Sequence, residues 1–542
     1  MDHLAMANGL HQPKTSNWRQ QQVRDQLGHT SSDDSRPTSP PFRLPMTTPV
    51  RIAPLRLRFV IVGGSLGGLS VAFALARSGH NVHVVEQRER LVEDACGVRI
   101  PPNLARILDR WGLGKDFKEK AILCKQLTFR KLRTGEKLGH LEYKEEVMKV
   151  LEADFWLMHY SDLLAQMYSL AISAGAIVQF GTSVTKVNPS KPSVTLSTGE
   201  KLFPDLVIGA DGYHSICQQA IEAAIIAEGD DPTTRVDSGT VVYSMNADVS
   251  DVTLDSDPEL YDIIHKPVWT AYAGPNVSVL TSPSRDYTQF SVQIFNPDVP
   301  GTIDTWEKIV SIDKINTEGF PRALLELTRR AEHAVETKFV KRKINEWVHP
   351  KSKLVLLGES AHPQIPSSTH SGSLAVEDAA VFGALFSRLR SREQIRNFLV
   401  AYEDLRKERC WDIQQSESAN SASVMLPDGP AQEERDRSMR EAAKLGSGGW
   451  DESTFRHLWE NIRILFAYDP EEDAEEWWQR WGLLREQSKS GFGRGRLVMD
   501  TCGERRYESH NDNDSDSDGS VTNPYSMTRA VTVVVESLDS DD

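Results

Sequence analysis

The stretch that most limits the possible folds is FVIVGGSLGGL, residues 59–69, where an apolar run meets a glycine-rich loop. The apolar run is typical of a strand buried in a parallel sheet. The segment after it, GGLSVAFALARSG, predicts a helix with Leu69, Phe73 and Ala76 on one face and Gly79 at its end. NVHVVE, residues 81–86, predicts a second strand. A strand, a helix and a strand within about 30 residues indicate a parallel sheet.

The loop itself fits two motifs with different chemistry. Gly63, Ser65 and Gly67 fit the G-x-S-x-G nucleophile elbow of hydrolases. The same loop fits the dinucleotide fingerprint G-x-G-x-x-G, with Gly63 and Gly68 at its ends and Ser65 in place of the middle glycine. The elbow requires earlier strands and an oxyanion loop, which the polar residues before 57 do not supply. The fingerprint requires an acid at the end of the second strand, and Glu86 stands there. We therefore predict a dinucleotide loop in which backbone N–H groups bind pyrophosphate.

Composition divides the chain into a body and two tails. Residues 1–55 are rich in Ser, Pro and Gln, and residues 486–542 are polar and acidic, so both segments are predicted to be disordered. Residues 56–395 form the predicted body, in which alternating strands at about 235–340 build a sheet over a pocket. SLAVEDAAVFGALFSRL, residues 373–389, predicts an amphipathic helix, and residues 396–485 predict a helical C-terminal region.

Charge, hydropathy and cysteine usage exclude several classes of function. A net charge of −15 argues against general nucleic-acid binding. The chain has no apolar run of about 18 residues, so we expect no transmembrane segment. Its start lacks a secretory signal, so a cytoplasmic protein is expected. The 5 cysteines include no C-x-x-C pair, and we predict no metal site.

Three further segments carry a family resemblance. DLVIGADGYHS at 205–215, LVLLGESAHP at 354–363 and GVRIPPNLARILDRWGL at 97–113 join GGSLGGL and Glu86 in one order. Together they resemble the FAD-dependent aromatic hydroxylases, that is, the salicylate hydroxylase-like flavin monooxygenases. LPDGPAQEERD at 426–436 is similar to a segment of their fungal members. The resemblance implies an α/β fold with a Rossmann-type FAD-binding domain interleaved with a mixed or antiparallel β-sheet substrate domain, plus a helical C-terminal region.

The resemblance also implies the residues that contact FAD. The glycine-rich loop would hold the pyrophosphate, and the acid after the second strand would bind the adenosine ribose. The D-G turn would contact both FAD and NAD(P)H, and the G-E turn would bind the ribityl hydroxyls. The implied cofactor-binding residues are Gly63, Ser65, Gly67, Gly68, Glu86, Gly97, Arg99, Asp211, Gly212, Glu359, Pro366 and Gly372. Pro366 and the turn at Gly372 would line the isoalloxazine ring.

Three arginines of the family pattern are absent from this chain. Tyr160, Gln218 and Ser244 stand at their positions, and this loss weakens the neutralisation of a pyrophosphate. Arg99 stands where relatives often carry glutamine, and we expect its charge to compensate in part. This expectation is a hypothesis about flavin occupancy.

The implied reaction is the hydroxylation of an aromatic, enol-like or polyketide-like small molecule in secondary metabolism. NADH or NADPH would reduce FAD, and O2 would add to form a flavin C4a-hydroperoxide that transfers an oxygen atom. Tyr243 is the candidate catalytic residue, as a hydrogen-bond partner of a phenolate, whereas His362 and His370 are expected to be structural. Two alternatives stay open: another flavin-dependent oxidoreductase of secondary metabolism, or a degenerate FAD-binding member with a regulatory or interaction role. The substrate, the choice between NADH and NADPH, and the oligomeric state have no signal in the sequence.

Overall fold

A computed structural model of the chain describes residues 19–20, 50–92, 96–229, 231, 233–298, 308–445 and 464–482. Within the segment predicted to be disordered, the short strand β1 (Arg19–Gln20) pairs with residue His80. Residues 1–18, 21–49 and 486–542 lie outside the described residues, so disorder there stays a prediction.

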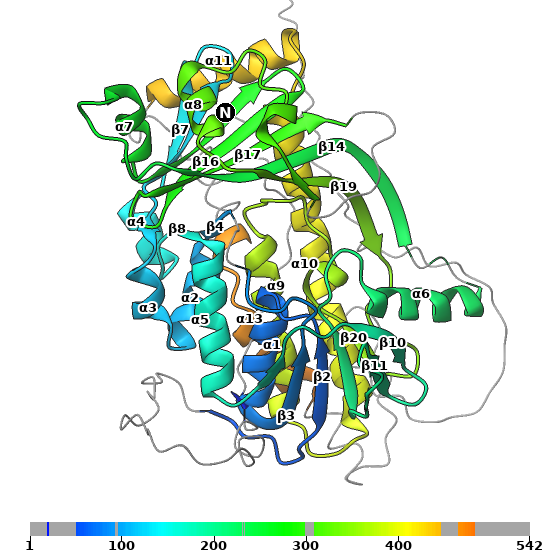
Figure 1. Cartoon of the computed structure of the whole chain (residues 1–542). Helices are drawn as coiled ribbons and strands as arrows, with labels where there is room; N and C mark the ends of the chain where they lie inside the picture. The colour runs from blue at the N-terminus through cyan, green and yellow to red at the C-terminus, as the bar shows by residue number, and fades with distance from the viewer. Residues whose placement is uncertain are drawn as a thin grey trace, which may run out of the picture.

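The predicted parallel sheet is present and forms the lower part of the view in Figure 1. Its strands run in the order β1-β3-β2-β13-β20, and β9 pairs with β3. Their bounds are β2 (Arg58–Val62), β3 (Ser78–Val85), β9 (Ile177–Gln179), β13 (Leu206–Gly209) and β20 (Leu354–Leu356). Helix α1 (Leu66–Ala76) connects β2 to β3, as the sequence predicts. The loops after β2, β13 and β20 therefore meet at one edge, the carboxyl ends of the strands, where α/β sheets bind ligands.

A second sheet of 8 strands covers the other end of the molecule (Figure 1). Its order is β18-β19-β14-β17-β16-β15-β6-β7. The strands are β6 (Gln126–Lys131), β7 (Lys137–Glu142), β14 (Thr233–Asp248), β15 (Val268–Gly274), β16 (Val277–Ser284), β17 (Gln289–Pro297), β18 (Lys308–Val310) and β19 (Ala334–Ile344). All pairs are antiparallel except β15 with β6, so the sheet is mixed. The sheet predicted from residues 235–340 thus also includes two strands from 126–142.

Alternation along these strands gives the large sheet two different faces. Met245, Val292 and Ile294 belong to an apolar cluster that also contains Leu324 and Leu327 of helix α8 (Arg322–Arg329). Side chains of the opposite face, including Ser244, Asn246 and Trp269, line two cavities.

The helix predicted to be amphipathic, α9 (Ser371–Ser387), is instead buried along its length from Ser373 to Ser387. It packs against α1, α2 (Pro102–Arg110), α10 (Gln394–Val424) and α13 (Pro470–Trp477). Its acidic residues Glu377 and Asp378 are fully buried and pair with arginines of α10. The prediction of a solvent-exposed face was wrong because these acidic residues pair with buried arginines instead of facing solvent.

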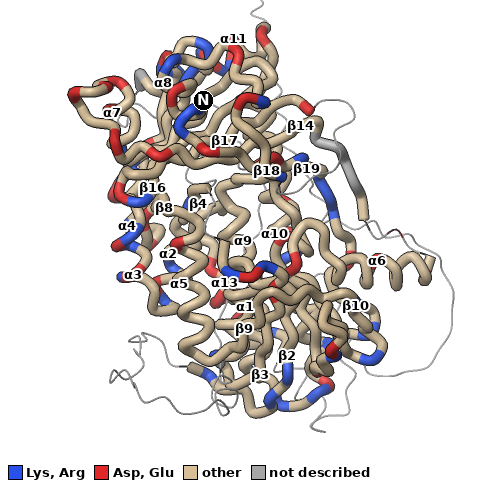
Figure 2. Tube along the Cα trace, viewed as in Figure 1, with Lys and Arg blue, Asp and Glu red and all other residues tan. Residues whose placement is uncertain are grey.

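The remaining elements complete the two layers. The helices are α3 (Gly114–Lys118), α4 (Glu145–Val150), α5 (Tyr160–Ser173), α6 (Ile216–Glu228), α7 (Pro258–Ile264) and α11 (Pro430–Leu445). The strands are β4 (Gly97–Ile100), β5 (Ile122–Leu123) and β8 (Trp156–His159) in one small sheet, and β10 (Val184–Asn188), β11 (Ser193–Leu196) and β12 (Lys201–Leu202) in another. No helix among the described residues has the length and apolar character needed to cross a membrane. Figure 2 shows acidic positions gathered around α7, at the outer side of the large sheet.

Candidate active site

A cavity of about 840 Å³ opens at the carboxyl ends of the parallel strands and extends to the large sheet. We call it the large cavity. The predicted cofactor residues that line it are Ser65, Gly67, Glu86, Gly212, Glu359, Pro366 and Gly372. Gly63, Gly68, Gly97, Arg99 and Asp211 are not among the lining residues. The structure therefore brings the separated motifs of the sequence to one site. Some of their residues line the large cavity, and others lie behind its lining.

Two glycines of the loop are required by close backbone contacts. Gly63 has φ +101°, and a Cβ atom there would lie 2.7 Å from the carbonyl carbon of Ala210 and closer still to its oxygen. A Cβ atom at Gly68 would overlap the carbonyl oxygen of Gly63. These contacts pack the start of α1 against the loop and leave its first N–H groups at the large cavity, an arrangement suited to a pyrophosphate.

Ser65 takes the place of the middle glycine without backbone strain. It is the N-cap residue of α1, with φ −78° and ψ −174°, an extended conformation that any residue adopts. Its side chain makes no capping hydrogen bond, and the residue lines the large cavity. Because nothing at this position demands a glycine, the serine is compatible with a dinucleotide loop.

Glu86 follows β3 and points at the glycine loop. Its Oε2 accepts a hydrogen bond from the N–H of Gly64 at 2.6 Å, and its Oε1 accepts one from the N–H of Arg88 at 2.9 Å. The residue is only 5% exposed yet lines the large cavity. A carboxylate has further lone pairs, so ribose hydroxyls remain its predicted partners.

The two other turns differ in how they reach the large cavity. Gly358, at φ +66°, donates its N–H to Oδ2 of Asp378 at 3.0 Å, which fixes the turn that carries Glu359 into the lining. Asp211 instead accepts hydrogen bonds from Ser215 Oγ at 2.6 Å and Cys217 N at 3.1 Å. Burial raises the pKa of the Asp211 carboxyl. Its contact with FAD and NAD(P)H stays a prediction.

Other arginines surround the large cavity where the family arginines are missing. Tyr160 and Ser244 line it, and the Tyr160 hydroxyl accepts a long hydrogen bond (3.4 Å) from the N–H of Leu66. Gln218 lies outside the lining and donates to Glu222 at 2.9 Å. The arginines that line the cavity are Arg88, Arg90, Arg285 and Arg330. The sequence predicted a role for none of these arginines, although Arg88 and Arg90 closely follow Glu86 at the end of β3.

A second, smaller cavity of about 190 Å³ lies between the large sheet, α10 and the loop of residues 365–370. We call it the small cavity. Aromatic side chains form much of its wall: Phe129, Tyr143, Phe155, Trp269, Phe295 and Phe466. Pro366 and Ser367 line both cavities. Ser367 has φ +60°, a strained conformation for a non-glycine residue and one that often marks functional sites.

Arg99 is buried beside this shared wall, with 3% of its surface exposed. Its Nη2 donates to the carbonyl oxygen of Ser367, and its guanidinium lies 5.0 Å from the centre of the Trp269 ring. Its Nε and Nη1 have no hydrogen-bond partner among the described residues. Burial lowers the pKa of Arg99, and the nearby Glu417 opposes that effect. Arg99 itself lines neither cavity, so this buried cation would act on a ligand through the wall that Ser367 forms.

Two residues of the large sheet occupy opposite faces near the site. Tyr243 packs against the apolar cluster under the sheet and lines neither cavity, and its catalytic role stays a prediction. Gln293 is fully buried between strand neighbours Ser244 and Leu280, which line the large and the small cavity respectively. Neither amide atom of Gln293 has a partner among the described residues, and Gln293 itself lines neither cavity.

Hydrogen bonds join the small sheet to the large one and position Gly97. The Gly97 N–H donates to Ser291 Oγ at 2.6 Å, and a Cβ atom at Gly97 would lie 2.8 Å from that oxygen. Ser291 donates to Asn246 Oδ1 at 2.8 Å, and Asn246 Nδ2 lies 3.1 Å from His159 Nε2. Gly97 therefore lets β4 approach β17 beside the large cavity.

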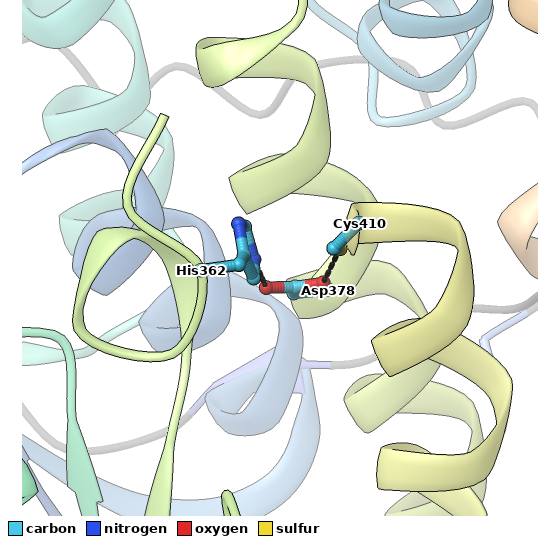
Figure 3. A group of neighbouring side chains, drawn as sticks. All are labelled: His362, Asp378 and Cys410. Atoms are coloured by element: carbon cyan, nitrogen blue, oxygen red, sulfur yellow. Dashed lines mark hydrogen bonds and ion pairs between the residues drawn. The ribbon is translucent and has the colours of Figure 1, made fainter. Parts of the chain in front are cut away.

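Figure 3 shows His362, Asp378 and Cys410 clustered together. The cluster adjoins the Gly358 turn, since Asp378 accepts the hydrogen bond from the N–H of Gly358. Asp378 Oδ2 lies 2.5 Å from His362 Nε2, and Oδ1 accepts from Arg406 Nε at 2.7 Å. Although burial opposes the charge, Cys410 and Asp378 raise the pKa of His362 to about 10. Arg406 also donates from Nη2 to Cys410 Sγ at 3.6 Å, so its guanidinium contacts two of the three side chains. The cluster forms an internal ion-pair network, and the structural role of His362 stays a prediction.

These residues fit FAD by their own chemistry. The glycine contacts leave no room for side chains under the start of α1, and the helix N-terminus, an acid and several arginines surround one elongated cavity. The shared wall at Pro366 and Ser367 then connects this cavity to an aromatic one suited to a small ring compound.

Comparisons with known proteins agree with this fit. A family model described as "FAD binding domain" matches residues 56–417. The chain is 27% identical over 387 residues to the FAD-dependent monooxygenase OpS4 of Beauveria bassiana (strain ARSEF 2860), covering 71% of this chain and 89% of the relative. It is 28% identical over 402 residues to 3-amino-4-hydroxybenzoate 2-monooxygenase PtmB3 of Streptomyces platensis, covering 73% and 95%.

Solved structures share the fold. Klebsiella pneumoniae HpxO complexed with FAD and uric acid superposes with a TM-score of 0.60 at 21% identity, covering 75% of this chain and 97% of that chain. A salicylate hydroxylase substrate complex superposes with a TM-score of 0.56 at 18% identity, covering 76% and 98%. Both confirm the α/β architecture with its helical C-terminal region.

Proposed function

Since the chain belongs to the FAD binding domain family and is an FAD-dependent monooxygenase, we propose that it hydroxylates a small aromatic or enol-like molecule, with NAD(P)H and O2 as co-substrates. One observation carries this proposal: the large cavity, which fits FAD, and the small aromatic cavity share a wall at Pro366 and Ser367. A ring compound in the small cavity would lie next to the flavin end of the large one.

When bound, FAD supplies the redox chemistry, by accepting reducing equivalents and activating O2. The residues of the chain supply position and environment. The glycine loop and Glu86 would hold the adenine dinucleotide end, and Glu359, Pro366 and Gly372 the flavin end. The aromatic wall of the small cavity would orient the substrate ring and exclude water. Arg99, buried beside the shared wall, would stabilise negative charge that develops there.

We also propose a division of the chain into domains. Residues 56–395 would form the FAD-binding body and residues 396–485 the helical region, with the substrate sheet drawn from about 235–340. Helix α10 lines the small cavity through Ile413, Ser416 and Asn420, which supports a role of the helical region in substrate binding. β6 of the earlier segment contributes Leu127 and Phe129 to the same wall.

A degenerate, non-catalytic member is less well supported. That alternative rested on the missing family arginines, yet Arg88, Arg90 and Arg285 line the same cavity. Arg285 is itself positioned by hydrogen bonds to Asp162 and Ser161, each at 2.9 Å. These cations can neutralise a dinucleotide phosphate in place of the lost ones.

The decisive experiment combines flavin loading with turnover. The purified full-length chain is expected to bind FAD, to show visible flavin absorbance, and to consume NADH or NADPH faster when a suitable aromatic compound is added. Mass spectrometry should find one oxygen atom added to that compound. A chain that stays colourless after FAD titration would contradict the proposal, and so would FAD-loaded protein with no stimulated NAD(P)H oxidation across a broad aromatic library.

Replacing Arg99 by glutamine is expected to lower flavin affinity by roughly tenfold, which corresponds to about 1.4 kcal/mol. The change removes the hydrogen bond to Ser367 and the buried positive charge beside the flavin end of the cavity. FAD titration monitored by flavin fluorescence measures the affinity. Arg437→Gln, at an exposed position on α11, is the control and should leave it unchanged. If the Arg99 variant binds FAD with unchanged affinity, the charge of Arg99 does not compensate for the missing family arginines.

A further inference from the structure

The polar groups of the small cavity are unevenly distributed. Among the described residues that line it, Glu417 is the one carboxyl group, and none is lysine or arginine. Its volume of about 190 Å³ exceeds the roughly 150 Å³ of an apolar cavity known to hold benzene. The cavity can therefore take an aromatic ring system, and the ring would meet a single acidic group.

Glu417 lies on α10 and turns its carboxyl group toward the loop of residues 365–370. Its Oε1 accepts a hydrogen bond from the N–H of Thr369 at 3.1 Å. The side chain is partly exposed, and it lines the small cavity. Because a carboxylate offers about four lone-pair sites, it retains acceptor capacity for a ligand after this bond to the loop.

The charges that face Glu417 nearly cancel. Burial raises the pKa of Glu417 to about 7, although Arg99 and the N–H groups of Thr369 and His370 oppose that rise. Burial, followed by the charge of Arg409, lowers the pKa of His370 to about 3, so this imidazole is neutral. Burial also raises the pKa of Tyr143, which keeps its hydroxyl protonated. At a pH above this pKa, Glu417 is a carboxylate, and Glu417 and Arg99 are the two opposed charges beside the small cavity.

This balance disfavours a charged ligand. A carboxylate or an ammonium group bound here would add one uncompensated charge in an aromatic, poorly hydrated cavity, and such burial is costly. A neutral ligand leaves the balance intact. A neutral ligand that donates a hydrogen bond also satisfies the remaining acceptor sites of Glu417, and hydrogen bonds to charged groups are the stronger ones.

We propose that the small cavity selects a neutral aromatic molecule bearing an N–H or O–H donor, and that Glu417 determines this specificity by accepting the hydrogen bond. The inference rests on the proposed function, because it takes the small cavity as the substrate site. It names the substrate class by its chemistry: a ring compound with a donor and no free carboxylate.

Calorimetric titration of the full-length, FAD-loaded protein tests this specificity without NAD(P)H. Indole and 1-methylindole form the N–H pair of probes, and 2-naphthol and 2-methoxynaphthalene form the O–H pair, with 2-naphthoate as the anion. At least one donor is expected to bind about tenfold more tightly than its methylated partner, and 2-naphthoate more weakly than 2-naphthol. Comparing the two pairs shows whether the donor is N–H or O–H.

Glu417→Gln is the informative variant. Its amide oxygen can still accept from Thr369, so the loop stays anchored, while its amide nitrogen presents a donor to the cavity. The preference for the donor probes should fall to less than about threefold, and 2-naphthoate should bind more tightly than to the unchanged protein. Glu408→Gln makes the same charge change on the exposed side of α10 and should leave all five affinities unchanged.

Three results would overturn the inference. The unchanged protein could bind donors no better than methylated probes, the preference could survive in Glu417→Gln, or none of the five probes could bind. Each concerns binding alone. A protein that binds donors selectively but oxidises no NAD(P)H would instead contradict the proposed function and leave the specificity of the cavity established.

Discussion

Replacing Gly63 by alanine is expected to reduce FAD affinity by at least about 100-fold, equivalent to roughly 3 kcal/mol. The new Cβ atom would lie 2.7 Å from the carbonyl carbon of Ala210 and closer to its oxygen, so strands β2 and β13 would have to separate. Gly63 also has φ +101°, which strains any other residue by about 1–2 kcal/mol. Because the loop that follows β2 lines the large cavity through Gly64 and Ser65, its displacement should move the N-terminus of α1 away from the dinucleotide. FAD titration and thermal unfolding with and without FAD measure both effects.

Gly229→Ala is the matched control for this prediction. Gly229 ends helix α6 at φ +97°, close to the φ of Gly63, and a Cβ atom there would meet nothing within 4 Å. It should therefore lose a similar amount of stability from backbone strain while keeping its FAD affinity. If both variants bind FAD equally well, the loop of residues 63–68 is not the dinucleotide site and the placement of FAD in the large cavity fails.

The local patterns of the sequence predicted those parts of the fold that depend on nearby residues. The strand–loop–helix at 59–76 and the acid at Glu86 form one continuous unit, and the structure has them as β2, α1 and the end of β3. The strands after them pair in parallel because the chain crosses over by helices. Their glycine turns at Gly212 and Gly358 then meet at one edge, which is why separated motifs could be joined correctly.

The small cavity could not be predicted in the same way. Its lining runs from Leu127 to Phe466 and comes from several strands, helices and loops, so no local spacing records it. The parallel pairing of β15 with β6, which brings Phe129 into that lining, joins segments about 140 residues apart. Glu417 gives no signal either, because α10 carries many acids and only packing decides which of them faces inward.

Replacing Glu377 by glutamine is expected to lower the free energy of unfolding by about 3–5 kcal/mol, the usual cost of breaking a buried ion pair. This fully buried carboxylate accepts hydrogen bonds from Arg406 at 2.7 Å, from Arg409 at 3.0 Å and from Asn103 at 2.6 Å. Glutamine has nearly the same shape but no charge, so Arg406 would keep Asp378 as a carboxylate partner, whereas Arg409 would lose the carboxylate with which it pairs. Denaturant unfolding of the FAD-free protein measures the loss.

Glu145→Gln provides the comparison on the surface. Glu145 pairs with Lys149 at 2.7 Å, and both side chains are at least 70% exposed, so the change should leave the free energy of unfolding almost unchanged. A loss of similar size in both variants would mean that the charges around Glu377 are effectively solvated, and the account of α9 as a helix held by an internal network would be wrong.

The pH dependence of unfolding and a double variant identify the cause of the stability loss expected in Glu377→Gln. Although burial opposes ionisation, Arg409 and Arg406 lower the pKa of Glu377 below its ordinary value. The stabilisation is therefore present above the pKa of the unfolded chain and is lost as pH falls through the lower folded value. The difference in the free energy of unfolding between the unchanged protein and Glu377→Gln should accordingly become smaller at acidic pH.

The double variant Glu377→Gln, Arg409→Met should also recover part of the lost stability, because it removes the cation left without a partner. Recovery would assign the cost to unpaired charge, whereas a further loss would assign it to the packing of Arg409 against Tyr468, whose ring centre lies 3.7 Å from the guanidinium.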